Sequence, residues 1–60
     1  MTDLQERIIH ASLRLFSLKG FVNTSVADIM DSANTSKGGF YNHFSSKEDL
    51  FFKVLKEARG

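Results

Sequence analysis

No proline interrupts this chain of 60 residues, and its apolar side chains recur at three- and four-residue spacing. That spacing is the period of an α-helix with one buried face, whereas a half-buried strand would alternate every second residue. Only four glycines are present to break such helices. The sequence therefore predicts an all-α fold of helices joined by tight turns, packed as one small domain over residues 1–60.

The first predicted helix spans about residues 3–19 and stops at Gly20, where positive φ costs nothing. The second begins after Ser25, which forms a capping box with Asp28, and stops near Asn34. Asparagine is the non-glycine residue that best tolerates left-handed backbone, so a sharp turn is expected there. The buried stripe of the first helix comprises Ile8, Ile9, Ser12, Leu15 and Phe16.

A third short helix is predicted after Ser36, which is placed to cap it. Phe40 and Phe44 lie four residues apart, so they share a face and are expected to point into the core. Two short helices joined by a tight turn, after a longer helix, describe a helix-turn-helix, here at about residues 24–43. The fold predicted is a homeodomain-like bundle of three helices plus the start of a fourth.

The fourth helix is expected to begin after two serines, with acidic residues in its first turn that suit the helix dipole. A second capping box is expected, formed by Ser46 with Asp49 or by Ser45 with Glu48. The apolar stripe of this helix comprises Leu50, Phe51, Val54, Leu55 and Ala58. It is still running where the sequence ends at Gly60, so we expect that the natural protein continues.

The stretch "SKGGFYNHF" holds poor helix formers, namely two glycines beside aromatic, amide and imidazole side chains. This composition suggests a helix that contacts a partner and not only water. In a helix-turn-helix the second short helix enters the DNA major groove. Glycines would let its backbone approach DNA, and free N–H groups in its first turn would suit a phosphate. Tyr41, Asn42 and His43 are then expected to face the groove, with Lys47 reaching a phosphate.

Net charge alone does not indicate nucleic acid, since the formal value is only +1. No acid lies between Asp31 and Glu48, however, and Lys37, His43 and Lys47 fall in that gap. One face can therefore be electropositive on a nearly neutral domain. The alternative is that these lysines are ordinary solvated side chains.

The stretches "TSVADIM" and "SKGGFYNHFSSKEDLF" resemble the DNA-binding segment of the tetracycline-repressor (TetR) family of bacterial regulators. The matching positions are Phe16, Gly20, Thr24, Ser25, Ile29, Ser36, Lys37, Gly38, Tyr41, Phe44, Ser46, Lys47 and Glu48. Four positions depart from the family pattern. Ser12 replaces the usual small Ala, and Asn34 replaces the usual turn glycine. Thr35 replaces a usual apolar residue that helps to hold the turn, and Gly39 replaces a more frequent Thr or Ser.

The resemblance implies sequence-specific DNA binding by a transcriptional regulator, most often a repressor. Its expected DNA contacts are Thr24, Ser25, Ser36, Lys37, Gly38, Gly39, Tyr41, Asn42, His43 and Lys47. It further implies a homodimer on a palindromic operator in double-stranded DNA, and a C-terminal domain, absent here, that dimerises and binds a small-molecule inducer.

Other function classes find little support. No cysteine is present, the two histidines lie on different predicted helices, and capping explains the serines at helix starts. We therefore expect no enzyme activity, no metal and no cofactor. No apolar run approaches a membrane span and the first residues do not resemble a signal peptide, so a cytoplasmic protein is expected. The alternative function is a protein-interaction module that uses the apolar face of the fourth helix.

Overall fold

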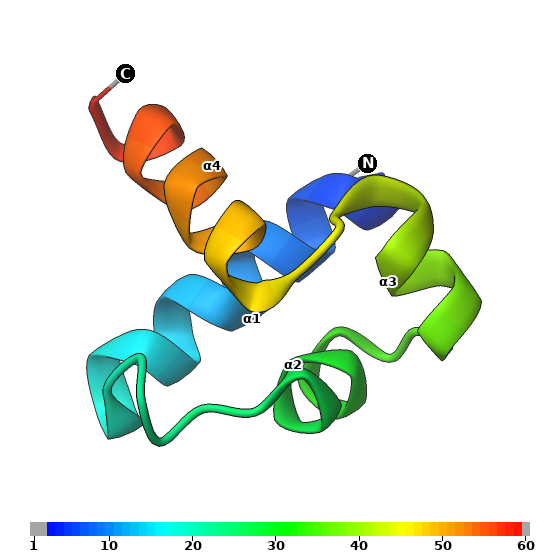
Figure 1. Cartoon of the computed structure of the whole chain (residues 1–60), viewed down its shortest axis with the longest axis horizontal. Coiled ribbons are helices and arrows are strands. Elements are labelled where there is room, and N and C mark those ends of the chain that lie inside the picture. Colours follow the sequence, from blue (N-terminus) through cyan, green and yellow to red (C-terminus); the bar gives the residue numbers. More distant parts are fainter. Residues whose placement is uncertain (1–2, 60) are drawn as a thin grey trace.

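The computed structural model describes residues 3–59, with side chains up to residue 56, and helices are the only regular secondary structure in this part. Its four helices are α1 (Leu4–Lys19), α2 (Val26–Ala33), α3 (Lys37–His43) and α4 (Lys47–Arg59). Helix α1 crosses the middle of the molecule, and the other three helices pack around it (Figure 1). The prediction of an all-α helix-turn-helix bundle is confirmed.

The core lies where these helices meet α1. Its fully buried side chains include Ile8 from α1, Ile29 from α2, and Leu50 from α4. The predicted stripe of α1 is confirmed, with Leu15 and Phe16 only partly buried at its end. Ser12 is also buried, and its hydroxyl donates to the carbonyl of Ile9 at 2.8 Å, so no polar group is left unpaired there. Ala58 lies outside the described side chains.

Helix α1 begins and ends at the residues that its local sequence predicts. The carboxylate of Asp3 accepts the N–H of Glu6 at 2.9 Å, which caps the first turn. Gly20 has a φ of 84° and donates its N–H to the carbonyl of Phe16 at 2.9 Å. The Phe21 ring then folds back to 5.4 Å from the ring of Phe16.

The turn between α2 and α3 is the tight corner of the helix-turn-helix. Ser25 and Asp28 form the predicted capping box at the start of α2. Asn34 ends the helix in the left-handed conformation, with φ 56° and ψ 52°. The N–H of Thr35 donates to the carbonyl of Met30 at 3.0 Å, a Schellman bond that closes the turn. The predicted sharp stop at Asn34 is confirmed.

Helix α4 uses one of the two capping arrangements left open by its sequence. The Ser46 hydroxyl accepts the N–H of Asp49 at 3.0 Å, and the Asp49 carboxylate accepts the N–H of Ser45 at 3.1 Å. The return bond thus reaches one residue further back than in a standard capping box.

Among the described helices, none combines the length and apolar character needed to cross a bilayer.

Candidate nucleic-acid interface

Helix α3 is fixed by its apolar side and presents a polar side outward. Phe40 and Phe44 are 0% and 1% exposed, and their ring centroids lie 5.8 Å apart within the core. The opposite side exposes Lys37, Gly38, Tyr41 and Asn42, which we call the outer face of α3. Positions 37 and 41, and positions 38 and 42, are four residues apart, so these residues are neighbours on one helix surface.

The outer face of α3 has polar groups left over for a partner. Tyr41 is 45% exposed, and its ring packs edge-on against Phe40 with the centroids 5.0 Å apart. Within the part of the chain that the structure describes, the side chains of Lys37, Tyr41 and Asn42 make no hydrogen bond to another residue. One phenol, one amide and one ammonium group therefore point to solvent from a well-supported helix.

Two of the predicted contact residues are exposed serines that already cap helices. The hydroxyl of Ser25 accepts the N–H of Asp28 at 3.0 Å, and the hydroxyl of Ser36 accepts the N–H of Gly39 at 3.1 Å. A serine hydroxyl has one O–H donor in addition to its acceptor lone pairs. Each serine can therefore cap its helix and still donate to a phosphate oxygen.

Two other predicted contact residues point into the protein. Thr24 is 1% exposed, and its hydroxyl donates to the carbonyl of Gly20 at 2.8 Å. The ammonium of Lys47 donates to the carbonyls of Phe21 and Thr24, both at 2.9 Å. In this structure both side chains stabilise the loop between α1 and α2, an arrangement that differs from the expected reach towards DNA phosphates.

The two glycines of α3 lie in different surroundings. At Gly38 the nearest atom to an added Cβ would be Oγ of Ser36, 3.9 Å away, so the space is open. At Gly39 an added Cβ would collide with Oγ1 of Thr35 and lie 3.1 Å from Cδ2 of Leu4. Internal packing therefore favours glycine at position 39, which the sequence analysis attributed only to close approach of DNA.

His43 lies at the end of α3 and is half-buried. Its carbonyl accepts a hydrogen bond from the ammonium of Lys53 at 3.3 Å. The same ammonium lies 5.1 Å from the ring centroid of Phe44. Lys53 thus places a positive charge at the C-terminal end of α3, where the helix dipole favours one.

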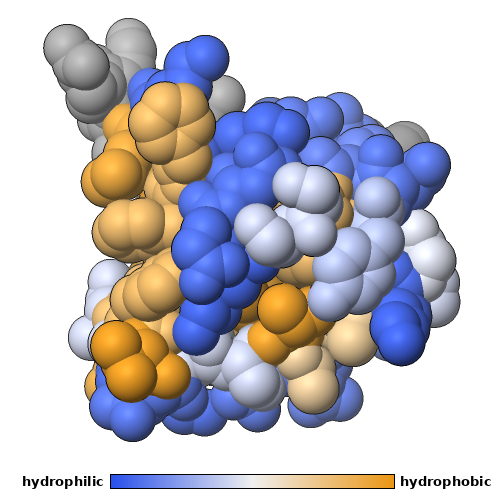
Figure 2. All heavy atoms as spheres, viewed as in Figure 1, coloured by the Kyte–Doolittle hydropathy of each residue, from blue (hydrophilic) through white to orange (hydrophobic). Residues whose placement is uncertain are grey.

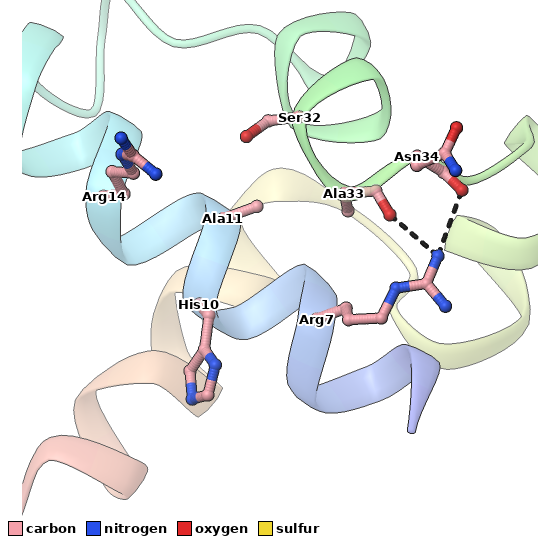
Figure 3. Close-up of a pocket in the computed structure, with 7 residues that line it drawn as sticks. All are labelled: Arg7, His10, Ala11, Arg14, Ser32, Ala33 and Asn34. Atoms are coloured by element: carbon pink, nitrogen blue, oxygen red, sulfur yellow. Dashed lines mark hydrogen bonds between the residues drawn. The ribbon is translucent and has the colours of Figure 1, made fainter. Parts of the chain in front are cut away.

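Arg7 has a structural role that the sequence analysis missed. Its guanidinium donates to the carbonyls of Ala33 and Asn34, at 2.9 and 3.1 Å, across the groove between α1 and α2 (Figure 3). These carbonyls belong to the C-terminal end of α2 and to the turn that follows. Arg7 therefore connects α1 to the turn between α2 and α3 and stabilises that turn. Its partners lie 26 and 27 residues away, so no local sequence signal indicates this role.

Two acids in the first turns of helices, Asp28 and Asp49, are paired within the protein. The hydrogen bond from Lys19, at 2.8 Å, and the N–H of Ser25 lower the pKa of Asp28 to about 2. The N–H of Ser45 is the main cause that lowers the pKa of Asp49. Helix α3 itself carries no acid. The exposed charge on its outer face is therefore the positive charge of Lys37.

Together these elements define a helix-turn-helix domain with one short helix presented to solvent. The chain belongs to the tetR family of bacterial regulatory proteins, whose family model matches residues 8–54. It is 50% identical over 56 residues to the uncharacterized HTH-type transcriptional regulator YerO of Bacillus subtilis, covering 93% of this chain and 19% of YerO.

Two other relatives have more specific names. The chain is 36% identical over 56 residues to the HTH-type transcriptional repressor DhaR of Mycobacterium sp. strain GP1, covering 93% of this chain and 28% of DhaR. It is 34% identical over 53 residues to the HTH-type transcriptional regulator QacR of Staphylococcus aureus, covering 88% of this chain and 29% of QacR. The chain thus spans less than a third of these curated relatives. No solved structure matches it.

Proposed function

We propose that this chain is the DNA-binding head of a ligand-responsive transcriptional repressor and that α3 enters the major groove of its operator. The observation that carries the proposal is the outer face of α3, which is polar, free of acids and held rigidly from behind by Phe40 and Phe44. The family relationship supports it, and the name of DhaR describes a repressor.

The chemistry of this face suits duplex DNA. A major groove about 12 Å wide admits a helix, and the open space at Gly38 leaves the backbone of α3 free to approach the DNA. The Asn42 amide can pair with adenine through two hydrogen bonds. Lys37 and the Tyr41 hydroxyl are suited to phosphate oxygens, as are the O–H groups of Ser25 and Ser36.

In the whole protein, we place this head in a homodimer that binds a palindromic operator in the cytoplasm. A separate C-terminal domain would bind the small-molecule inducer. Apolar side chains gather over α4 in Figure 2, where Phe52 and Leu55 are 65% and 48% exposed. This surface is suited to packing against that domain. A second candidate function, docking of another protein on α4, depends on the same two side chains.

Selection of duplexes from a random-sequence pool would identify an operator, and fluorescence anisotropy would then measure its affinity across a salt series. Lys37→Met should lower the slope of log K against log salt by about one unit, because one fewer counterion is released. Lys56→Met is a matched control, because Lys56 is also an exposed lysine but lies on α4 instead of α3. No enrichment of any duplex, even by two copies joined through a flexible linker, would contradict the proposal. Amide shifts confined to Phe52 and Leu55 on adding a protein partner would favour the second candidate.

A further inference from the structure

We propose that Lys47 is a positioning residue that holds the α1–α2 loop, and with it the start of α2, in the orientation needed for DNA binding. The inference rests on the proposed function. It differs from the expected role of Lys47 as a phosphate contact. The observation behind it is that the ammonium lies between two backbone carbonyls of a loop more than 20 residues away in sequence.

The hydrogen bonds of Lys47 close that loop. Its Nζ lies 2.9 Å from the carbonyl oxygen of Phe21 and 2.9 Å from that of Thr24. Two carbonyl oxygens that converge on one point repel each other unless a donor lies between them, and a charged donor makes the stronger hydrogen bond. An ammonium has three N–H donors, so two of the three are engaged within the protein.

The loop is anchored on both sides of these bonds. The Phe21 ring packs against Phe16 and Phe51, with centroid separations of 5.4 and 4.8 Å. Lys47 Nζ also lies 4.3 Å from the Phe21 ring centroid, close enough for a cation–π interaction. On the other side, buried Thr24 donates its hydroxyl to the carbonyl of Gly20 at 2.8 Å. Lys47, the first residue of α4, therefore connects α4 to a fixed loop structure.

Helix α2 begins directly after this loop. Thr24 is followed by Ser25, the residue that caps α2 and that the proposed function places at a phosphate. A shift of the Thr24 carbonyl would therefore move the Ser25 hydroxyl and the first N–H groups of α2. Lys47 is half-buried and acts through the loop, whereas Lys37 is exposed and has no hydrogen-bonded partner among the described residues.

The test compares Lys47→Met and Lys47→Gln with Lys37→Met, measuring the Kd for a fluorescein-labelled mixed-sequence duplex below the melting temperature of each variant. Lys47→Met should weaken binding about tenfold at every salt concentration, because the loop loses two charged hydrogen bonds. The salt slope should change by less than about half a unit, since no phosphate contact is removed. Lys47→Gln should lose less affinity, because its neutral amide can still donate to one carbonyl.

A second measurement follows the DNA-free protein by NMR. The amide signals of Ser25 to Asp28 should shift in both Lys47 variants and remain unchanged in Lys37→Met. If Lys47→Met does not fold, Lys47→Gln and the Nζ signal of wild-type Lys47 remain informative. That Nζ signal should keep its position when DNA is added, because its partners are carbonyls of the protein.

Two results would overturn the inference. Equal losses of affinity in both Lys47 variants, with a salt slope lowered by about one unit, would show a direct phosphate contact. A lowered melting temperature with an unchanged Kd for the folded protein would show a purely structural role. Failure of the proposed function is distinguishable, because wild-type protein would then not bind the duplex while the Ser25 to Asp28 signals would still respond to Lys47.

Discussion

Asp28 is the residue whose ionisation most directly links pH to the stability of the start of α2. Its folded-state pKa of about 2 lies below the ordinary aspartate value of about 3.9. A lowered pKa means that the folded state favours the ionised form, so the contribution to stability is complete above about pH 4 and lost as pH falls towards about 2. The main cause is the hydrogen bond from Lys19, followed by the N–H of Ser25.

Asp28→Asn should therefore lower the melting temperature at pH 7 and make less difference as the pH approaches 2. Circular dichroism melts over this pH range, on wild type and variant, provide the measurement. Lys19→Met removes the partner of Asp28 and should reproduce part of the same pH-dependent difference. A difference between wild type and Asp28→Asn that stays constant from pH 7 to pH 2 would show that ionisation of Asp28 does not stabilise the fold.

At the level of the elements, the sequence predicts the four helices well because their signals are local. The cap at Ser25 and the turn at Asn34 each depend on contacts between residues three to five positions apart. The hydrogen bonds of the Arg7 and Lys47 side chains depend instead on packing between helices. Arg7 bonds to the carbonyl of Ala33, 26 positions away, and Lys47 bonds to that of Thr24, 23 positions away. Spacing along the chain does not encode such contacts. For this reason the exposure of Tyr41 and Asn42 was predictable. The half-buried position of His43 and the inward position of the Lys47 ammonium were not.

Alanine substitutions at the two glycines of α3 should separate effects on stability from effects on DNA binding. Gly38→Ala should raise the free energy of unfolding by about 0.5 kcal/mol, because alanine is the better helix former and the space is open. It should also weaken DNA binding if the backbone approaches the groove there. Gly39→Ala should gain little or no stability, since Thr35 and Leu4 must move to accommodate the methyl group.

Urea unfolding and anisotropy titrations of both alanine variants measure these two effects, and each variant is the other's control. Equal gains in stability would mean that Thr35 and Leu4 adjust without cost. A Gly38→Ala variant that binds DNA as tightly as wild type would show that α3 does not bring its backbone close to the duplex at this position.

For the whole molecule, the number of lysine and arginine side chains left free to contact DNA limits the affinity of a single copy. Arg7, Lys47 and Lys53 donate to carbonyls of the fold, and Lys19 pairs with Asp28. A single head therefore neutralises few phosphates and should bind weakly. Its longest dimension of 25 Å is shorter than the roughly 34–36 Å between half-sites one helical turn apart, so two heads fit side by side on the same face of the duplex.

Joining two copies through a flexible linker should therefore tighten binding to a palindromic duplex by about 10²–10⁴-fold, because the second head binds at a high effective concentration. The gain comes from simultaneous binding and needs no new contact within either head. With a linker just long enough for half-sites one helical turn apart, moving the half-sites apart by half a helical turn should remove most of the gain. The second site then lies on the opposite face of the DNA, beyond the reach of that linker. An untethered single copy that binds one half-site as tightly as the pair binds two would contradict both the cation count and the proposed dimeric arrangement.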